Sequence, residues 1–366
     1  MSAPTHVLMT VDCVGGVWTY GLDLCRALRR SGVEVTLAVL GPAPSPSQRQ
    51  AAVAIEGLNL VETGLPLDWL APDAATVMDT GRAVAALARE AGADLAHLNS
   101  PALAACGAFD RPVVGACHSC LKTWWDAVKG GEPPADFRWR ADLVQRGYDA
   151  CTALIAPSQA FAEATAHAYP GTRPLVVLNG RAWPQPSAPA QRSRQVITAG
   201  RLWDAGKNLA VLDQAAAALS APMLAAGPLA GPQGEEMAPA HVRPLGALGP
   251  ADLARRLGES QVFVSLALYE PFGLSVLEAA QAGCALVLSD IPTFHELWQG
   301  AALFVDPDEP QAVGEVLEAL LADPARAARI GAAARERAAR YSVEAMTAGT
   351  LGSYAMALAA SQEAAA

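Results

Sequence analysis

The sequence has no hydrophobic run of the ~20 residues needed to cross a bilayer as a helix. Its first ten residues read as a short polar lead and then a strand, without the basic flank or small-residue cleavage site of a secretory signal. We therefore expect a soluble, cytoplasmic protein with at most peripheral membrane contact.

Basic residues are fewer than acidic ones: the chain has 26 Lys and Arg and 36 Asp and Glu, which gives a net charge of −10. An acidic surface disfavours nucleic acid as a partner and broad adhesion to anionic membranes. The seven cysteines are odd in number and scattered, which is typical of reduced thiols in a reducing compartment. The sequence does not determine an oligomeric state.

Two familiar nucleotide-binding fingerprints are missing. Gly15 and Gly16 follow the first expected strand, but their spacing is not that of a Gly-x-Gly-x-x-Gly dinucleotide loop or of a phosphate-binding loop with its Lys-Ser/Thr. The second expected strand also ends without an acidic residue for an adenosine ribose, so NAD is disfavoured. Paired glycines still allow a backbone to approach an anion closely, although they often serve only a tight strand-to-helix turn.

The chain has 366 residues, of which 52% are hydrophobic, so two domains are expected. Strand-like and helix-like segments alternate in both halves, which predicts parallel sheets covered by helices on both faces. Residues 181–193 hold three prolines and few large apolar residues, and we expect the linker there. The fold class is therefore α/β, with two Rossmann-like doubly wound domains, residues 1–182 and 194–342, that face a central cleft.

The expected elements can be given by residue number. Strands are expected at 6–11, 33–40, 58–62, 95–98, 113–116, 153–156, 175–178, 195–199, 222–226, 242–245, 262–266 and 285–289, and helices at 17–30, 76–91, 159–167, 208–218, 251–257, 273–282 and 309–321, with a helical tail from 324 to 360 in two or three pieces.

The most informative segment runs from Glu270 through Phe272-Gly273-Leu274 to Glu278. Its Phe-Gly-Leu is expected to open a helix, whose first N–H groups lack partners and whose positive end attracts an anion. Glu270 precedes the helix and Glu278 lies within it. Donors for a diphosphate between two acceptors of hydroxyl groups match the layout of a nucleotide sugar.

Arg201 and Lys207 lie between a strand and a helix of the second half. Arginine offers a planar fork suited to phosphate and lysine a movable charge. Taken alone, the pair reads more readily as surface charges near a turn, whereas beside the Glu270 segment a diphosphate contact is the better interpretation.

Cys117-His118-Ser119-Cys120 follows an apolar strand. The Cys-x-x-Cys spacing suits zinc, but no second ligand pair is present, and a thioredoxin-type site needs its own fold context. We interpret His118 as a polar contact to a sugar, with a loop histidine that caps a strand end as an equally good alternative.

Aromatic and basic residues are mixed between residues 122 and 148, and they include Trp124, Trp125 and Trp139. Aromatic faces stack on sugar rings or lipophilic groups, but a packed helical excursion with a basic edge explains the composition slightly better. If the acceptor is specific, its selectivity is expected here and near residues 99–101. His295 and Glu296 either line the cleft or begin a helix.

Taken together, the Gly15-Gly16 turn, Gly200-Arg201 with Lys207-Asn208, and Glu270-x7-Glu278 with its Phe-Gly-Leu resemble the retaining glycosyltransferases of the GT-B fold, family 4 type. The resemblance covers nearly the whole chain, and a Gly227-Pro228 turn is similar too. The sequence departs from the family pattern in two places, and the second leaves the identity of the sugar open. The strand end before Glu270 is more apolar than is usual in the family, and the loop at residues 290–296 lacks glycines.

The resemblance implies a role for each residue. The last helix, about 343–366, would cross back onto the first, acceptor-side domain, while the second domain would bind the nucleotide sugar. Arg201 and Lys207 would neutralise the leaving diphosphate together with backbone N–H groups; Glu270 would bind sugar hydroxyls, Glu278 the ribose, and His118 the sugar or acceptor. The N–H groups would come from Gly16 of the Gly15-Gly16 turn and from Phe272, Gly273 and Leu274, and the backbone at Leu245 and Gly246 would contact the base.

The sequence thus predicts a retaining, metal-independent hexosyltransferase without a cofactor. Its donor would be a UDP- or GDP-linked sugar, and its acceptor a small-molecule, glycan or lipid-linked hydroxyl. The alternatives are a nucleotide-sugar epimerase, a phosphorylase with pyridoxal phosphate on the same fold, or a non-catalytic protein that binds nucleotide sugars.

Overall fold

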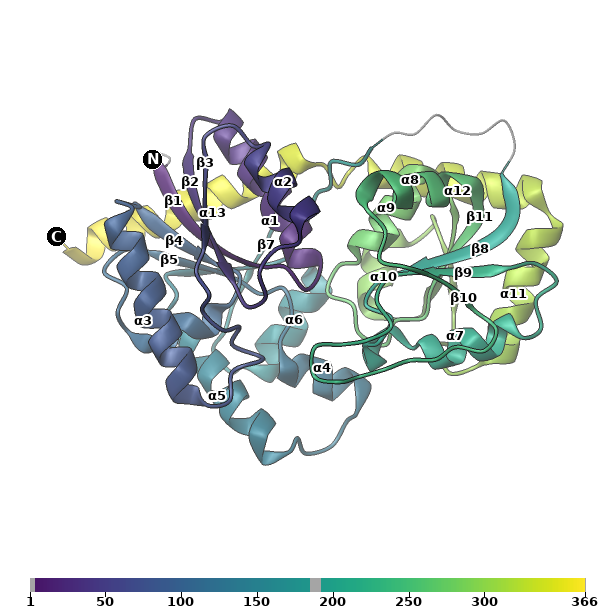
Figure 1. Ribbon diagram of the computed structural model, residues 1–366, viewed down its shortest axis with the longest axis horizontal. Coiled ribbons are helices and arrows are strands. Elements are labelled where there is room, and N and C mark those ends of the chain that lie inside the picture. The colour runs from purple at the N-terminus through teal and green to yellow at the C-terminus, as the bar shows by residue number, and fades with distance from the viewer. Residues whose placement is uncertain (1–3, 185–191, 366) are drawn as a thin grey trace. The chain divides into compact units, whose positions relative to one another are not determined.

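The computed structural model describes residues 4–184 and 192–365. The chain forms two compact units, one of Met1–Gly180 with Val343–Ala366 and one of Arg181–Ser342, and each is described by itself (Figure 1). Residues 185–191, which are most of the expected linker, lie outside the described residues.

The first unit is built on a seven-stranded sheet in which every neighbouring pair is parallel. Its strand order is β3-β2-β1-β4-β5-β6-β7, so the chain moves outward in one direction and then returns past β1 to build the other half. The bounds are β1 His6–Asp12, β2 Glu34–Leu40, β3 Leu58–Glu62, β4 Leu95–Leu98, β5 Val113–Ala116, β6 Ala153–Ala156 and β7 Leu175–Val176.

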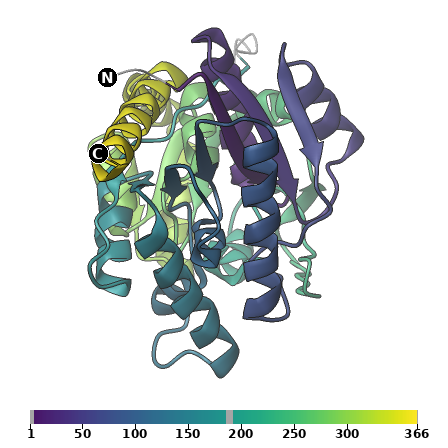
Figure 2. The same cartoon turned by 90° about the vertical axis from the view of Figure 1, so that its left-hand side faces the viewer.

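Helices cover both faces of this sheet (Figure 2). On one face α1 and the C-terminal helix pack against alternate residues of β1, such as Val7 and Met9, and on the other face α3 and η1 pack against Leu8. The alternation follows from the two-residue period of a strand. The helices are α1 Gly16–Arg30, α2 Pro46–Val53, α3 Ala74–Glu90, η1 Pro101–Cys106, α4 Leu121–Val128, α5 Ala135–Ala150 and α6 Gln159–Ala168.

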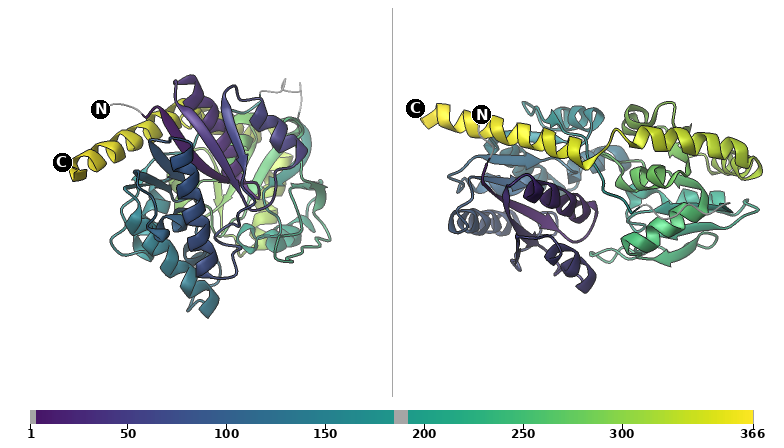
Figure 3. Two further views of the ribbon diagram at one scale, coloured as in Figure 1. Left: turned by 60° about the vertical axis from the view of Figure 1, so that its left-hand side comes forward. Right: turned by 90° about the horizontal axis from the view of Figure 1, so that it is seen from above.

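The C-terminal helix α13, Val343–Ala365, belongs to the first unit although it follows the whole second unit in sequence (Figure 3). It packs on α1, β5 and β6. Met346 and Tyr354 are fully buried there in the same core cluster as residues of β1 and β2. The helix therefore closes one face of the first sheet.

The second unit contains a six-stranded parallel sheet in the order β10-β9-β8-β11-β12-β13. Helices α7 and α11 pack on one face, and α8 and α9 on the other (Figure 1). The strands are β8 Ser193–Ala199, β9 Met223–Ala226, β10 Arg243–Gly246, β11 Ser260–Ser265, β12 Ala285–Ser289 and β13 Leu303–Val305, and the helices are η2 Ala205–Lys207, α7 Leu209–Ala216, α8 Pro250–Glu259, α9 Leu274–Ala282, α10 Pro292–Trp298, α11 Pro310–Ala322 and α12 Pro324–Ala338.

The predicted α/β class with two Rossmann-like domains is confirmed. Some details differ: the strand expected at 175–178 ends at Val176, β13 was not predicted, and residues 122–148 form two helices. Residues 292–298 form α10, so His295 and Glu296 lie in the first turns of a helix, as one of their two interpretations expected. No helix in the described parts of the chain is both long and apolar enough to cross a membrane.

Candidate functional site

Three glycines pack together where β8, β9 and β10 end. Gly200 N–H donates to Ala226 O at 3.0 Å, and Gly227 N–H donates to Gly246 O at 2.8 Å. A Cβ atom at Gly227 would lie 1.8 Å from the carbonyl oxygen of Gly200, so no other residue fits there. Gly246 and its neighbour Leu245, the residues expected near a base, therefore sit at this edge of the sheet.

The turn after β8 places the two predicted phosphate-binding cations. Asp204, which is 8% exposed, accepts from Arg201 Nη2 at 3.1 Å and from the Gly206 N–H at 2.9 Å, and so ties the arginine to the turn that carries Lys207. Asn208 ends this turn in the left-handed region, with φ 56°, and its side chain donates to Pro307 O at 2.9 Å. Sequence reasoning gave Asp204 no role, because its function here is to brace a loop.

Lys207 meets Glu270 directly: Nζ lies 2.5 Å from Oε2. The two side chains are 20% and 13% exposed, so the pair is partly shielded from water and still accessible to a ligand. A backbone bond from Leu268 N–H to Gly206 O, 2.9 Å long, holds the two loops side by side. β8 and β11 are neighbours in the sheet, and this adjacency brings the two loops together.

Helix α9 begins beside this pair. Gly273, the residue before its first turn, has φ 91°, and no side chain caps the helix start. The left-handed conformation favours glycine, and an added Cβ would also lie 3.2 Å from Val276 and 3.4 Å from Glu270 Cγ. Phe272 is buried against Tyr341, whereas Leu274 is partly exposed. The uncapped N–H groups of this first turn make a positive, donor-rich surface next to Glu270.

Glu278 lies one turn further along α9 and is only 7% exposed. Its Oε1 accepts from Arg181 Nε at 2.8 Å, in a pair whose side chains are 9% and 10% exposed. The Arg181 guanidinium also lies 5.2 Å from the ring centre of Trp183, and Gln281 Nε2 donates to Arg181 O at 3.0 Å. Arg181 was placed in the expected linker by its proline-rich surroundings, and nothing in the sequence pairs it with Glu278.

In the first unit, Gly15 and Gly16 begin α1. Gly15 is the N-terminal cap residue in an extended conformation, and no side chain caps the helix. Asp12 Oδ1 accepts from the Val14 N–H at 2.8 Å, which shapes the turn that leads into the helix. The turn therefore offers backbone donors, as the paired glycines suggested.

His118 follows β5, and its Nε2 lies 2.7 Å from Asn99 Oδ1. The ring of Tyr20 packs edge-on against it, with 4.4 Å between ring centres. Burial, and then the charge of nearby His97, lower the pKa of His118 to about 3, so the imidazole is neutral at physiological pH. The contact with a substrate and the loop histidine that caps a strand end both stay predictions for His118.

The thiols that flank His118 are not prepared for metal or redox chemistry. Burial raises the pKa of the Cys117 thiol to about 12. The Tyr169 hydroxyl donates a hydrogen bond to Cys120 Sγ at 3.0 Å. Across the described residues, no group of three or more His, Cys, Asp or Glu side chains is arranged to hold a metal ion. The zinc interpretation of this motif therefore gains no support.

The aromatic residues of α4 and α5 largely contact their own neighbours. Trp125 packs edge-on against Phe137 at 4.9 Å, and Trp139 donates Nε1–H to Asp136 at 2.8 Å while Arg140 lies 4.2 Å from its ring centre. These contacts fit the packed helical excursion. An acceptor contact by Trp124, Trp125 or Trp139 stays a prediction.

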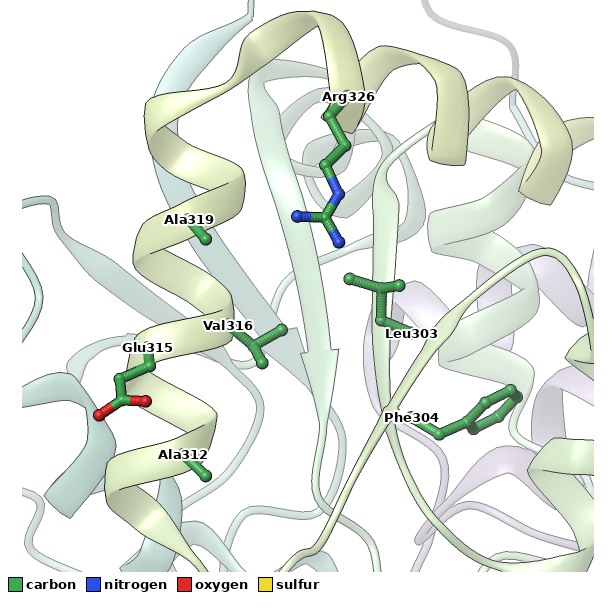
Figure 4. Close-up of a pocket in the computed structure, with 7 residues that line it drawn as sticks. All are labelled: Leu303, Phe304, Ala312, Glu315, Val316, Ala319 and Arg326. Atoms are coloured by element: carbon green, nitrogen blue, oxygen red, sulfur yellow. The ribbon is translucent and has the colours of Figure 1, made fainter.

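A separate groove of about 410 Å³ lies between α11, α12 and the edge strand β13 (Figure 4). Val316 and Leu303 point toward each other across it, and Glu315 points away. Nearby, His295 stacks on Phe304 at 3.9 Å and bonds Asp290 at 2.6 Å. None of the predicted site residues lines the groove, so it is distinct from the Lys207–Glu270 site.

Two family profiles divide the chain between them. "Glycosyltransferase Family 4" matches residues 14–181, and "Glycosyl transferases group 1" matches residues 181–337. The chain belongs to the glycosyltransferases of family 4. Together the matched ranges include every predicted site residue named above, and the predicted family is confirmed.

Similar proteins agree in fold. The solved structure of sucrose-phosphate synthase from Thermosynechococcus elongatus aligns over 97% of this chain and 100% of its own, with a TM-score of 0.79 and 19% identity. Anabaena HepE in complex with UDP and glucose aligns over 95% and 100%, with a TM-score of 0.70 and 20% identity. These likenesses establish the GT-B fold.

One curated relative is similar over a shorter stretch. The α-maltose-1-phosphate synthase of Mycobacterium tuberculosis H37Rv is 36% identical over 89 residues, which span 22% of this chain and 23% of that protein. The matched stretch thus covers about a quarter of the relative's length.

Proposed function

We propose that this family 4 glycosyltransferase is a retaining, metal-independent enzyme that moves a hexose from a UDP- or GDP-linked sugar to an acceptor hydroxyl. The observation that carries the proposal is the contact of Lys207 with Glu270 beside the uncapped start of α9. One cation, one anion and the backbone donors of a helix start lie side by side at one edge of the second sheet.

The charges suit a diphosphate that gains negative charge as it leaves. Lys207 uses one N–H on Glu270 and retains two, and Arg201 is 34% exposed beside Asp204. Fixed donors aimed at developing charge are commonly worth 10²–10³-fold in rate each. The proposal therefore assigns Arg201, Lys207 and the N–H groups of Phe272, Gly273 and Leu274 to the leaving diphosphate, in place of a metal ion.

The carboxylates suit the hydroxyl groups on either side of that diphosphate. Glu270 keeps acceptor capacity beyond its bond to Lys207 and would hold the sugar, while Glu278 would hold the ribose in the shielded setting that it shares with Arg181. Hydrogen bonds to charged groups are worth ~1.5–3 kcal/mol each. The base would lie by Leu245 and Gly246, next to the packed strand ends.

The comparisons support a nucleotide-sugar donor, since a protein of the same fold is known in complex with UDP and glucose. In the first unit we propose that the turn at Gly15 and Gly16 offers further anion donors and that His118 contacts a substrate hydroxyl. The acceptor oxygen would attack on the face from which the diphosphate leaves, with a phosphate oxygen taking its proton. The proposal places the reaction in the cytoplasm.

The test is a thermal-shift screen of UDP, GDP and ADP and of their sugars, with uridine, guanosine and adenosine as controls that lack the diphosphate. A ligand that binds only the folded chain raises Tm through RT ln(1 + [L]/Kd). We expect one nucleotide and its sugar to raise Tm, the nucleoside to do so far less, and Lys207→Ala to abolish the difference. Equal shifts for nucleotide and nucleoside would contradict the proposed diphosphate site.

Turnover is then measured with the sugar that binds. NMR of the anomeric proton distinguishes retention from inversion, and an excess of EDTA tests the independence from metal. Binding of the nucleotide sugar without release of nucleotide diphosphate to any acceptor would leave only the binding-protein alternative, and absorbance of bound pyridoxal phosphate would favour a phosphorylase.

A further inference from the structure

A hydrogen-bonded chain runs from the C-terminal helix to His118 within the first unit. Tyr354 of α13 places its hydroxyl 2.9 Å from His97 Nδ1. His97 Nε2 lies 3.2 Å from Asn99 Oδ1, and His118 Nε2 lies 2.7 Å from the same oxygen. Tyr354 and His97 are completely buried. Asn99 is therefore the junction between a buried tyrosine–histidine pair and the partly exposed His118.

The orientation of the Asn99 amide is decided by strand β1. Its Nδ2 lies 2.6 Å from Thr10 O, and its backbone N–H donates to Thr10 Oγ1 at 3.0 Å. A carbonyl oxygen can only accept, so the amide atom that faces it must be the nitrogen. A flipped amide would set two oxygens against each other at that distance. Oδ1 consequently faces both histidines.

This orientation determines where the imidazole protons are. An amide oxygen accepts only, and its two lone pairs allow it to accept from two donors. His97 and His118 must therefore both carry a proton on Nε2. In neutral imidazole the second nitrogen is then unprotonated, so His97 Nδ1 accepts from the Tyr354 hydroxyl, and His118 Nδ1 is left with a free lone pair.

We propose that Asn99 is a positioning residue that holds His118 in the Nε2–H tautomer, so that Nδ1 accepts a hydrogen bond from a substrate hydroxyl. The mention of a substrate rests on the proposed function, whereas the tautomer does not. His118 is then an acceptor and not a proton donor to the substrate. The Tyr20 ring, packed edge-on at 4.4 Å, keeps the imidazole plane in place.

A purely architectural role for the same atoms makes a different prediction. If the chain of bonds only ties α13 to the sheet, Tyr354→Phe and Asn99→Leu should have similar effects, because each removes one link. If Asn99 determines the tautomer, only Asn99→Leu changes the protonation pattern of His118. Tyr354→Phe leaves Oδ1 and both of its Nε2 donors in place.

The first experiment is a long-range proton–nitrogen correlation spectrum of the full chain labelled with ¹⁵N-histidine, in which protonated and bare ring nitrogens have distinct shifts. We expect His118 in the Nε2–H form in the wild type and in Tyr354→Phe, and a mixture of tautomers in Asn99→Leu. An Nδ1–H form in the wild type, or the same pattern in the wild type and Asn99→Leu, overturns the proposal. If Asn99→Leu fails to fold, Asn99→Ala replaces it: it also removes the oxygen to which both Nε2–H groups donate, so a mixture of His118 tautomers is again expected.

The second experiment tests the acceptor role through release of nucleotide diphosphate from UDP-glucose and GDP-mannose. The amide oxygen of asparagine corresponds in position to imidazole Nδ1, so His118→Asn should retain several-fold more turnover than His118→Gln. The reverse order overturns the acceptor role. Thermal shifts by UDP and GDP should be the same in Asn99→Leu and in the wild type, because neither Asn99 nor His118 is among the proposed contacts to the nucleotide. A wild-type chain that binds neither nucleotide contradicts the proposed function alone, and the spectra still decide the role of Asn99.

Discussion

Lys207 and Glu270 are 63 positions apart in sequence, and yet Nζ of one lies 2.5 Å from Oε2 of the other. Each side chain neutralises the charge of the other. A diphosphate and a sugar hydroxyl could take over one partner each without leaving a charge uncompensated. The pair is in this sense prepared for a ligand that carries both groups.

Removal of either member should stop the reaction and leave the fold intact. We expect Lys207→Ala and Glu270→Ala to lower kcat by at least 10²–10³-fold, the range seen when one donor to a developing charge is deleted. The checks are turnover with the nucleotide sugar that binds and circular dichroism for the fold. Arg255→Ala, which removes an exposed cation from α8 paired with Asp252 and Glu259, is the matched control and should keep full turnover. Normal turnover in both site variants would end the proposed function.

The pair of Arg181 and Glu278 should matter for stability. Its side chains are 9% and 10% exposed, so Arg181→Met leaves a buried carboxylate without its cation, a change that typically costs 3–5 kcal/mol. Arg194→Met breaks the exposed pair with Glu318, whose side chains are 47% and 36% exposed, and should cost less than about 1 kcal/mol. Urea unfolding measures both. Equal losses would show that burial of the first pair has no consequence.

Stability should decline in acid because His97 is buried and neutral. Burial lowers its pKa to about 4, while the unfolded chain has an ordinary histidine near 6.5. Between these values the unfolded state binds more protons than the folded state, so the free energy of unfolding falls as pH drops from about 6.5 toward 4, by up to ~1.4 kcal/mol per pH unit for one such group. His97→Gln should flatten this slope when unfolding is measured across that window.

His295 provides the opposite case and serves as the control. Hydrogen bonds to Gln299 and Asp290 raise the pKa of His295. Its contribution to the free energy of unfolding is therefore fully present below the pKa of the unfolded chain and is lost as pH rises through the folded-state pKa. His295→Gln should therefore leave the acid decline unchanged. If His295→Gln reduces the loss of stability in acid and His97→Gln does not, the loss does not come from His97.

Gly273→Ala should damage both the helix start and the site. The residue has φ 91°, and the new Cβ would lie within 3.4 Å of Val276, Phe294 and Glu270. Left-handed backbone costs an L-residue roughly 1–2 kcal/mol, and the crowding displaces Glu270, so we expect reduced stability and a loss of turnover of tenfold or more. Gly352→Ala is the matched control. Gly352 lies in α13 with nothing within 4 Å, and the change should raise stability by up to ~1 kcal/mol.

Much of the second unit was predictable. The alternation of apolar strands with segments of helical period predicted its parallel sheet. The helix expected between Glu270 and Glu278 is also present, and Gly273 directly precedes it. The short strand β13 was missed because three residues carry no measurable period. Helix α10 was not predicted firmly, because His295 and Glu296 suit a cleft wall as well as a helix start.

In the first unit, the contacts around His118 could not be predicted from the sequence pattern. The motif Cys117–Cys120 suggested metal before it suggested anything else, and Asn99 was noted only as a neighbour of the expected acceptor region. Neither residue type nor spacing reveals that Asn99 faces two histidines, because the contacts come from β1, β4 and the loop after β5 together. The helix α13 adds Tyr354 from the far end of the chain.

The sequence by itself determined the strand–helix alternation, the two domains and the family, because hydrophobic period and local motifs are properties of neighbours along the chain. The tertiary structure alone decided that Glu278 pairs with Arg181, that Asp204 braces Arg201, and that Asn99 orients His118. These contacts depend on which strand ends lie side by side in each parallel sheet. The order of the strands is in turn set by the packing of the whole unit.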